Sequence, residues 1–239
     1  MDDYLIRTEM LIGKDAVERL ARSRVAVFGL GGVGGYVTEA LARTGVGSLD
    51  LIDSDTVALS NLNRQIIATR DTVGEKKTEA MKRRVLSINP GCNIRTWDLF
   101  YLPETNDMFN FSGYDYVVDA VDTVAAKLSL IEEAQKTGTR IISSMGAGNK
   151  LDATLFRVAD IYSTSVDPLA RVIRTECRKR GIRKLKVVYS TEKPITPLFT
   201  EETSSRRSTP ASIAFIPSVC GLIIAGEVIK DLIKKDINS

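Results

Sequence analysis

The chain has 239 residues, of which 44% are hydrophobic and 26% are charged, and its formal net charge is +3. This length allows one large domain with a substantial core, and the composition is that of an ordinary globular protein. The small net charge gives no reason to treat the whole molecule as a polycation. The chain contains no histidine and no Cys-x-x-Cys pair, which excludes a Cys/His zinc site and a Ser-His or Cys-His catalytic pair.

The cysteines and the apolar segments indicate in which cellular compartment the protein is expected. Cys92, Cys177 and Cys220 are odd in number and far apart, which argues against a disulfide framework and fits a reducing compartment. The first residues lack the basic and then apolar layout of a secretory signal. The apolar stretch 213–229 contains a proline and a glutamate, which favours a buried strand followed by a helix over a membrane span. We therefore expect a cytoplasmic protein that does not associate with membranes.

The first elements in chain order form a strand-turn-helix pattern. Residues 5–22 have the periodicity of one or two short amphipathic helices, in which Arg7 is either a solvated or a functional side chain. A strand is predicted over 24–28, a helix over about 32–44 and a second strand over 48–53. An apolar strand that enters a glycine-rich turn and then a helix is typical of a phosphate-binding site.

Five glycines fall within seven residues after the first strand. They are Gly29, Gly31, Gly32, Gly34 and Gly35. A tight turn alone can require a glycine, because glycine adopts positive φ angles without strain. Five of them exceed what a turn requires, which favours phosphate binding.

The residues after the second strand indicate the kind of nucleotide chemistry. Asp53 follows the turn by about twenty residues, where a doubly wound fold places a ribose-binding acid, although Asp53 and Asp55 could also simply end a strand. An NAD-dependent dehydrogenase would share this pattern. The polar segment that carries Ser60, Asn61 and Arg64 is not needed for NAD, and an arginine there suits a leaving phosphate better than a hydride.

A helix is predicted to begin near Lys76 and Lys77 and to end near Ile88. Lysines at a helix start oppose the helix dipole, so we expect one of the two to face an anion. Two further strands are predicted over 93–97 and 116–119.

Asp122 lies between the predicted strand 116–119 and a helix that runs through Ala134. It could cap this helix by accepting hydrogen bonds from backbone amides. It could instead lie at the carboxyl edge of the sheet, where ligands bind in open α/β folds and where a carboxylate could hold Mg²⁺ on nucleotide phosphates. The residues leave both roles open.

The last hundred residues continue the alternation of strands and helices. A helix from Asp167 is expected to bury one face, formed by Leu169, Val172, Ile173 and Cys177. The other predicted elements are a strand over 140–145, an edge strand over 154–161 whose alternation permits antiparallel pairing, a strand over 186–190, a long loop over 191–212, and a strand followed by an apolar helix over 212–235.

A dense positive charge lies in residues 171–186, where Glu176 is the one acid. Such a run is usually a solvated face, but a net charge of about seven over these sixteen residues makes a polyanion surface plausible, with contacts to phosphates rather than to bases. The basic residues that we single out are Arg171, Arg174, Arg178, Lys179, Arg180, Arg183 and Lys184, together with Arg206 and Arg207 in the long loop.

Taken together, these motifs resemble the superfamily of ubiquitin-activating-enzyme-like adenylyltransferases, which includes the molybdopterin-synthase and thiamine-biosynthesis adenylating enzymes. The matching segments are Gly29–Gly34, Asp53–Asp55, Ser60–Gln65, Gly74–Lys77, Ile88–Pro90 and Asp119–Asp122. Within the superfamily, the chain most resembles the tRNA threonylcarbamoyladenosine dehydratases. The segments that carry this second resemblance are 23–37, 167–174, 178–182 and 213–222.

The resemblance implies an α/β, Rossmann-like fold: a mainly parallel sheet with helices on both faces and a C-terminal strand/helix extension. A single domain would span residues 1–239. Its nucleotide-binding core would comprise residues 1–160, and residues 161–239 would form an extension that carries the basic, substrate-facing segment.

The resemblance also implies an ATP site. Gly32 would approach the α-phosphate, Asp53 would hold the ribose, and Asn61, Arg64 and Lys77 would contact the triphosphate. The remaining nucleotide-binding residues would be Gly29, Gly31, Gly34, Asp55 and Ser60.

Two implied roles concern the metal ion and the second subunit. Asp122 would bind Mg²⁺. In a homodimer like that of the relatives, Arg7 would reach the γ-phosphate of the ATP in the neighbouring subunit. Arg7, Arg64, Lys77 and Asp122 are thus the expected catalytic residues.

The reaction of the resembled family is the ATP-dependent cyclisation of the threonylcarbamoyl group on the adenosine beside the tRNA anticodon. A carboxylate is a poor electrophile, and conversion to an acyl-adenylate makes its carbonyl carbon open to attack, with positive charge offsetting the departing pyrophosphate. The carbamoyl nitrogen is in the same molecule, which favours ring closure. This chemistry requires no cysteine of the enzyme.

The main competing function is adenylation of the C-terminal glycine of a ubiquitin-like sulfur-carrier protein. Relatives with that activity commonly carry a paired-cysteine zinc site, which this chain lacks, and its Cys177 and Cys220 lie in apolar helical patterns that indicate burial. The basic segment instead suits the phosphate backbone of tRNA. A dehydrogenase is disfavoured by the polar segment 60–65, and a non-catalytic nucleotide-dependent scaffold is disfavoured by the full set of phosphate-facing residues. The sequence leaves open whether a sulfur-transfer or desulfurase-type partner protein cooperates.

Overall fold

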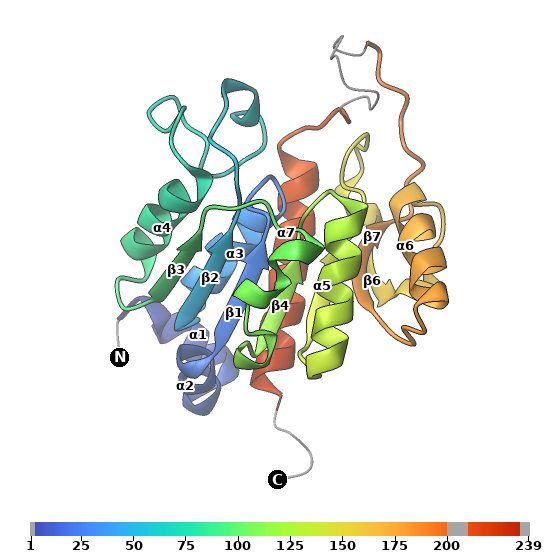
Figure 1. Cartoon of the computed structure of the whole chain (residues 1–239). Coiled ribbons are helices and arrows are strands. Elements are labelled where there is room, and N and C mark those ends of the chain that lie inside the picture. Colours follow the sequence, from blue (N-terminus) through green and yellow to red (C-terminus); the bar gives the residue numbers. More distant parts are fainter. Residues whose placement is uncertain (1–2, 200–209, 235–239) are drawn as a thin grey trace.

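A seven-stranded sheet forms the centre of the protein in the computed structural model, which describes residues 3–199 and 210–234. The strands are β1 Arg24–Phe28, β2 Ser48–Ile52, β3 Asn93–Trp97, β4 Tyr116–Asp119, β5 Ile141–Ser144, β6 Phe156–Asp160 and β7 Lys186–Ser190. Their order in the sheet is β3-β2-β1-β4-β5-β7-β6 (Figure 1). All neighbours pair in parallel except β6, which lies antiparallel to β7 at the edge. The predicted mainly parallel sheet and its antiparallel edge strand are confirmed.

Helices cover both faces of this sheet. They are α1 Ile6–Ile12, α2 Lys14–Arg22, α3 Gly34–Arg43, α4 Lys77–Ile88, α5 Val124–Thr137, α6 Pro168–Lys179 and α7 Phe215–Ile233. Short 3-10 turns lie at Asp3–Leu5, Leu59–Asn61, Pro103–Met108, Phe111–Gly113, Ala153–Leu155 and Ile161–Ser163. One face packs on α3, α4 and α7, and the other packs on α5 and α6 (Figure 1). Within the described ranges, no helix is both long enough and apolar enough to cross a membrane.

The central strand β1 shows why the sheet is covered twice. Its side chains alternate between faces, as in any strand. Val25 and Val27 join the core under α3 and α7, whereas Ala26 and Phe28 join an aromatic cluster on the other face. The Phe28 ring lies 4.9 Å from the ring of Tyr101. A continuous apolar run that is buried on both sides is typical of a parallel sheet between helical layers.

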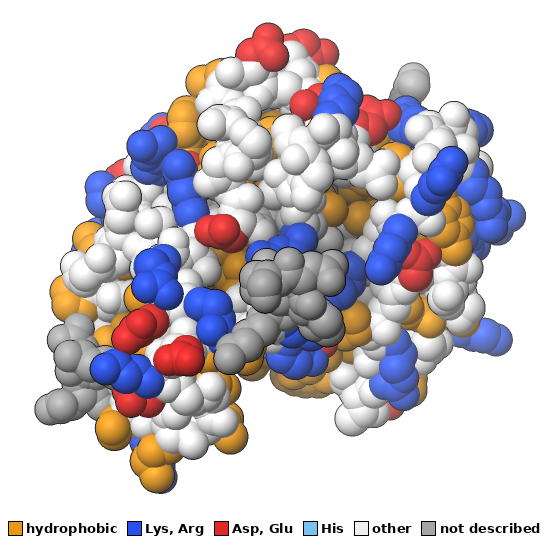
Figure 2. Space-filling model, turned by 90° about the horizontal axis from the view of Figure 1, so that it is seen from below, with side chains coloured by type: hydrophobic (Ala, Val, Ile, Leu, Met, Phe, Trp, Pro, Cys, Tyr) orange, Lys and Arg blue, Asp and Glu red, His pale blue; other side chains and the backbone are white. Residues whose placement is uncertain are grey.

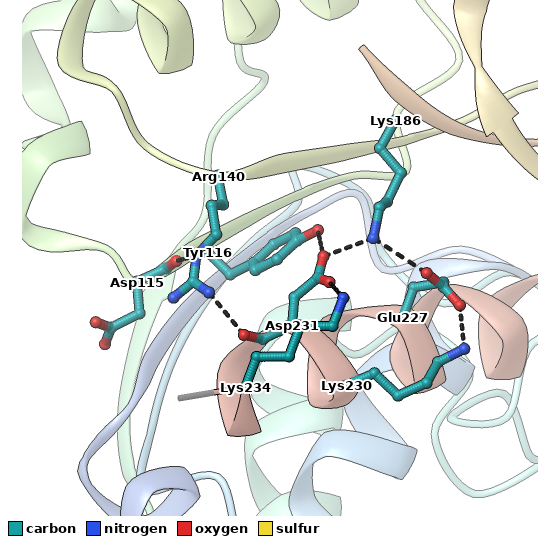
Figure 3. A network of polar contacts seen from close by, with 8 residues as sticks. All are labelled: Asp115, Tyr116, Arg140, Lys186, Glu227, Lys230, Asp231 and Lys234. Atoms are coloured by element: carbon teal, nitrogen blue, oxygen red, sulfur yellow. Dashed lines mark hydrogen bonds and ion pairs between the residues drawn. The ribbon is translucent and has the colours of Figure 1, made fainter. Parts of the chain in front are cut away.

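A polar network holds the C-terminal half of α7 against the amino ends of three strands (Figure 3). The Tyr116 hydroxyl donates to Asp231 Oδ2 at 2.9 Å, and Lys186 Nζ lies 2.6 Å from Asp231 and 3.0 Å from Glu227. Arg140 Nη1 donates to the backbone carbonyl of Asp231 at 2.8 Å. The network fixes α7 along the sheet, so that its N-terminal end reaches the opposite edge.

The prediction of a strand ahead of the last helix is wrong. The described residues 210–214 form no strand, and α7 begins at Phe215. Ile216, Cys220 and Ile224 are fully buried at a spacing of four residues. The apolar run therefore has a helical period from its first turn, which a short window does not distinguish from a buried strand.

The apolar face predicted for α6 needs one correction. Ala170, Ile173 and Cys177 are fully buried, but Val172 is 45% exposed. The buried stripe follows positions spaced by three and four residues, and Val172 falls outside it.

Candidate active site

A cavity of about 390 Å³ lies at the carboxyl ends of β1, β2 and β4. Here the strand order reverses: β1 is followed by α3 on one face of the sheet, and β4 is followed by α5 on the other. The loops that leave β1 and β4 therefore diverge and leave a crevice, which is where open α/β sheets bind their ligands.

Two glycines of the turn are required by packing. Gly29 has φ +88°, and its amide donates to the carbonyl of Ile52 at 2.8 Å. A Cβ on Gly29 would lie 2.7 Å from the carbonyl oxygen of Ala120, and a Cβ on Gly34 would lie 1.8 Å from the carbonyl oxygen of Gly29. These contacts bring β1, α3 and the end of β4 closer than any side chain allows, so Gly29 and Gly34 have a structural role.

Two other glycines of the turn face the cavity. Gly31 and Gly32 line it, and a Cβ on Gly32 would lie 3.0 Å from Pro217 Cβ at the start of α7. The turn leads into the N-terminus of α3, an end that favours anions. Gly31 and Gly32 thus leave open space at this wall of the cavity. Gly29 lines it as well, while Gly34 does not.

Asp53 joins the end of β2 to the glycine turn. Its Oδ2 accepts a hydrogen bond from the Leu30 amide at 2.7 Å, and its Oδ1 accepts one from the Asp55 amide at 2.8 Å. These two bonds fix the orientation of the carboxylate at the cavity wall, where Asp53 and Asp55 both lie.

Lys77 is the member of the lysine pair that lines the cavity. It is 5% exposed, and its Nζ lies 2.6 Å from Asp55 Oδ2 and 4.0 Å from Asp53 Oδ1. Lys76 is the exposed member, and it pairs with Asp98. The first residue of α4 thus brings a buried positive charge to the two carboxylates that end β2.

The predicted polar segment lies along one wall. Arg64 Nη1 donates to the Ser60 carbonyl at 3.0 Å and to Asn63 Oδ1 at 2.9 Å, which leaves the other guanidinium donors without a partner among the described residues. Asn61 Oδ1 accepts a hydrogen bond from the Ala58 amide at 3.1 Å. Arg64 and Asn61 line the cavity, but Ser60 does not.

Several lining residues were not predicted. Gln65 is buried and lines the cavity, and its Oε1 has no hydrogen-bond partner in the described part of the chain, which leaves this oxygen available to a ligand. The segments 99–101 and 147–148 also line the cavity. Both follow carboxyl ends of strands, so the topology could have indicated them. Pro217 gives no local signal, because it reaches the site from a distant helix.

Asp122 lines the cavity without capping α5. Thr123 occupies the N-cap position of that helix and makes no side-chain cap bond. Among the described residues, Asp122 accepts a hydrogen bond only from the Thr123 hydroxyl, at 3.3 Å. The capping interpretation is therefore wrong, and the exposed carboxylate is available to a ligand. The described residues contain no cluster of three or more His, Cys, Asp or Glu that could hold a metal ion. A single carboxylate still suits Mg²⁺ that is shared with nucleotide phosphates.

Arg7 lies apart from this cavity. It is exposed on α1 and is not among the residues that line the nucleotide cavity of its own chain.

The basic segment contains arginines that are engaged within the fold. Arg174 Nη1 donates to the carbonyl of Thr164 at 2.8 Å and to its hydroxyl at 2.7 Å. Arg180 Nε lies 2.9 Å from Glu132 Oε1 on α5. These two arginines connect α6 to its neighbours, which the sequence could not show.

The other basic residues of the segment are less engaged within the fold. Arg171, Arg183 and Lys184 are exposed, and their side chains form no ion pair or hydrogen bond with the described residues. Arg178 lies over the Tyr162 ring at 5.4 Å, and Lys179 pairs with the one acid of the segment at 2.7 Å. Lys and Arg side chains gather on the side of the molecule that carries α6 (Figure 2). The predicted Arg206 and Arg207 lie outside the described residues.

The three cysteines are free and buried. Burial raises the pKa of Cys177 to about 11 and that of Cys220 to about 12. Neither side chain is therefore a thiolate at neutral pH, which agrees with the buried, structural role predicted for both.

The sheet, its glycine turn and the charged cavity at the strand-order reversal define a Rossmann-like nucleotide-binding protein. More narrowly, the chain belongs to the ThiF family, whose model matches residues 5–239. This confirms the superfamily that the motifs indicated.

Similar proteins cover nearly the whole chain. It is 46% identical over 238 residues to the tRNA threonylcarbamoyladenosine dehydratase of Bacillus subtilis (strain 168), with 95% of this chain and 94% of that protein covered. It is 39% identical over 198 residues to the enzyme of the same name from Escherichia coli (strain K12), with coverages of 80% and 74%. The structure of the E. coli dehydratase TcdA in complex with ATP matches with a TM-score of 0.86 at 34% identity, over 95% of this chain and 92% of that one.

Proposed function

We propose that this protein catalyses the ATP-dependent dehydration of N6-threonylcarbamoyladenosine in tRNA by adenylating the threonyl carboxylate and closing a ring. The observation that carries the proposal is the single cavity that brings Lys77, Arg64 and Asp122 to a phosphate-accepting turn. The names of the relatives and the ATP complex of TcdA support it.

In the proposed complex, Gly31 and Gly32 admit the α-phosphate beside the N-terminus of α3. Asp53 holds the ribose hydroxyls with the lone pairs that its two amide contacts leave free. Lys77 and Arg64 bind the triphosphate, because both present positive charge to the cavity. Asn61 contacts the triphosphate from the same wall as Arg64, and Gly29 and Asp55 complete the predicted lining of the site.

The first chemical step joins the substrate to AMP. A carboxylate oxygen attacks the α-phosphorus, a new O–P bond forms, and the bond from this phosphorus to the pyrophosphate oxygen breaks. Lys77 and Arg64 offset the negative charge on the departing pyrophosphate. Asp122 would hold Mg²⁺, which supplies further charge neutralisation at the phosphates when it is bound.

The second step closes the ring within the substrate. The carbamoyl nitrogen attacks the activated carbonyl carbon, the bond to the AMP oxygen breaks, and the nitrogen loses its proton to solvent. The sum is loss of one water from the nucleoside and conversion of ATP to AMP and pyrophosphate. The intramolecular nucleophile makes a thioester unnecessary, which agrees with the burial of Cys177 and Cys220.

The proposal extends to the tRNA surface and the assembly. Arg171, Arg183 and Lys184 contact tRNA phosphates, because they carry the charges that the fold does not use. Arg7 acts on the nucleotide of a second subunit in a homodimer. The protein acts in the cytoplasm, where its substrate is found. A sulfur-transfer partner is not part of the proposal, because all three thiols are buried.

Mass analysis of tRNA nucleosides after incubation with ATP and Mg²⁺ tests the function. We expect threonylcarbamoyladenosine to lose the mass of one water, with no change when ATP is omitted. Arg64→Ala and Asp122→Ala should abolish most of this conversion while the protein stays folded. If the wild type leaves the nucleoside intact and instead adenylates the C-terminal glycine of a ubiquitin-like protein, the competing function is correct.

The salt dependence of tRNA binding tests the proposed surface. Combining Arg171→Glu, Arg183→Glu and Lys184→Glu should weaken binding and make the slope of log K against log salt shallower by roughly 0.7 to 0.9 per lost phosphate contact. Lys136→Glu, on the exposed end of α5, is the matched control. An unchanged slope in the triple variant would remove α6 and its following turn from the tRNA interface.

A further inference from the structure

A second cavity, of about 400 Å³, adjoins the proposed nucleotide cavity. Ala120, Asp122 and Gly148 line both, so the two cavities share a wall at the carboxyl end of β4. Most of the rest of the second cavity is formed by the segment that follows β5 and by the start of α6, and Val33, Pro194 and Pro210 complete it. Its volume is typical of a site for a small ligand.

A buried lysine without a counter-ion lines this second cavity. Lys150 is 4% exposed, and its Nζ donates to the backbone carbonyl of Glu192 at 3.1 Å. It forms no ion pair with any residue between 3 and 199 or between 210 and 234. The Glu192 carboxylate is engaged elsewhere, since it accepts hydrogen bonds from the backbone amides of Leu151 and Asp152, each at 3.0 Å. A buried ammonium with one neutral partner is costly unless an anion joins it.

The other buried charge of the cavity does not fill this role. Asp167 Oδ2 accepts a hydrogen bond from the Gly146 amide at 3.1 Å. Its Oδ1 accepts one from the Ala170 amide at 2.9 Å and so caps the N-terminus of α6. Burial raises the pKa of Asp167, and the charge of Lys150 only partly opposes that effect. Asp167 therefore serves the backbone, and Lys150 keeps donors for a ligand.

We propose that Lys150 binds the carboxylate of the threonylcarbamoyl group and presents it to the nucleotide. This inference rests on the proposed function and deepens it, because it names the residue that recognises the group to be adenylated. A carboxylate must approach the α-phosphate from a side that the nucleotide does not occupy. The second cavity supplies that side, and its shared wall at Ala120 and Asp122 is where acid and phosphate can meet.

The backbone beside Lys150 is held in place for this role. Asn149 has φ +58°, a left-handed conformation that asparagine adopts more readily than most residues with a side chain. Its Oδ1 accepts a hydrogen bond from the Ala211 amide at 2.7 Å, and its backbone carbonyl accepts one from the Ile195 amide at 2.8 Å. Asn149 thus joins segments from both sides of the cavity, and Pro210, next to one of them, lines it.

The test compares an acid with its neutral amide. The probes are an anticodon stem-loop RNA that carries threonylcarbamoyladenosine and the same RNA with the threonyl carboxylate converted to a carboxamide. We expect wild-type protein to bind the acid roughly 10- to 100-fold more tightly than the amide, as for other hydrogen bonds to charged groups. Lys150→Met should lose this preference, whereas Lys150→Arg should retain most of it.

Two further measurements make the result decisive. ATP affinity, measured by calorimetry, should be unchanged in Lys150→Met, which shows that the variant is folded; Lys136→Met controls for the removal of one positive charge. If Lys150→Met keeps the wild-type preference for the acid, Lys150 is a structural residue and the inference is wrong. If wild-type protein fails to dehydrate the modified tRNA, the proposed function fails instead, so the two failures are distinguishable.

Discussion

Replacing Lys77 with methionine removes the buried positive charge of the proposed triphosphate site. Its ammonium lies 2.6 Å from Asp55 and 4.0 Å from Asp53. Without it, these two carboxylates face the nucleotide uncompensated. Two unit charges 4 Å apart interact by about 4 kcal/mol at an effective dielectric constant of 20, and this is the upper limit for the binding energy that ATP loses. A hydrogen bond to a charged group contributes about 1.5–3 kcal/mol net, so we expect ATP to bind roughly 10- to 150-fold more weakly.

The neighbouring lysine provides a matched control for this experiment. Lys76→Met removes the same charge one residue earlier, but from an exposed side chain that pairs with Asp98. Calorimetric titration with ATP should therefore give near wild-type affinity for Lys76→Met and the large loss for Lys77→Met. Stability without ATP should change little in either variant, because the closer partner, Asp55, has a side chain that is 64% exposed. Equal ATP affinities in the two variants would refute the assignment of Lys77.

Three other predictions concern packing, cysteine chemistry and pH. Gly34→Ala should lower the free energy of unfolding in urea by more than about 3 kcal/mol, since its Cβ would lie 1.8 Å from a backbone oxygen; an undiminished value would show that the turn can move. Cys177→Ala and Cys220→Ala should keep dehydration activity in the nucleoside assay, because burial raises both thiol pKa values, to about 11 and about 12; loss of activity in a folded variant would contradict this. Burial opposes ionisation of Asp231, but hydrogen bonds from three neighbours lower its pKa from 3.8 to about 2. The contribution of Asp231 to the free energy of unfolding is thus complete above about pH 4 and is lost as the pH falls toward 2. Asp231→Asn should remove this loss; if the free energies of unfolding of wild type and variant run parallel over this pH range, Asp231 does not cause it.

Local patterns were sufficient to predict the sheet and the nucleotide turn. Buried apolar runs mark β1 and β4, and the glycine cluster follows the first of them, whereas the edge strand β3 is mostly polar and only partly buried. The cluster alone could not assign roles to single glycines. Close backbone carbonyls require glycine at Gly29 and Gly34, and the carbonyl beside Gly29 belongs to Ala120, about ninety residues away. Gly29, Gly31 and Gly32 line the cavity, whereas Gly34 does not. That division depends on the distance between elements, which no local pattern contains.

In the basic segment, residues 171–186, local sequence likewise does not show which charged side chains are engaged within the fold. The sequence of the segment identifies a surface rich in lysine and arginine but cannot distinguish free side chains from engaged ones. Arg180 pairs with Glu132 on α5, and Arg174 binds Thr164 ahead of α6. Because these partners lie outside the segment, only the fold shows that Arg171 and Lys184 are among the residues left for an anionic partner.

Lys150 is the most consequential residue that sequence analysis could not find. A lysine is usually exposed, and nothing in the segment after β5 predicts its burial. It is buried beside later segments of the chain: its Nζ donates to the carbonyl of Glu192, and the neighbouring Asn149 is hydrogen-bonded to Ile195 and Ala211. The result is two cavities that meet at Asp122, one lined by a phosphate turn and the other by an uncompensated ammonium. An enzyme that joins a carboxylate to a nucleotide needs that pair of sites.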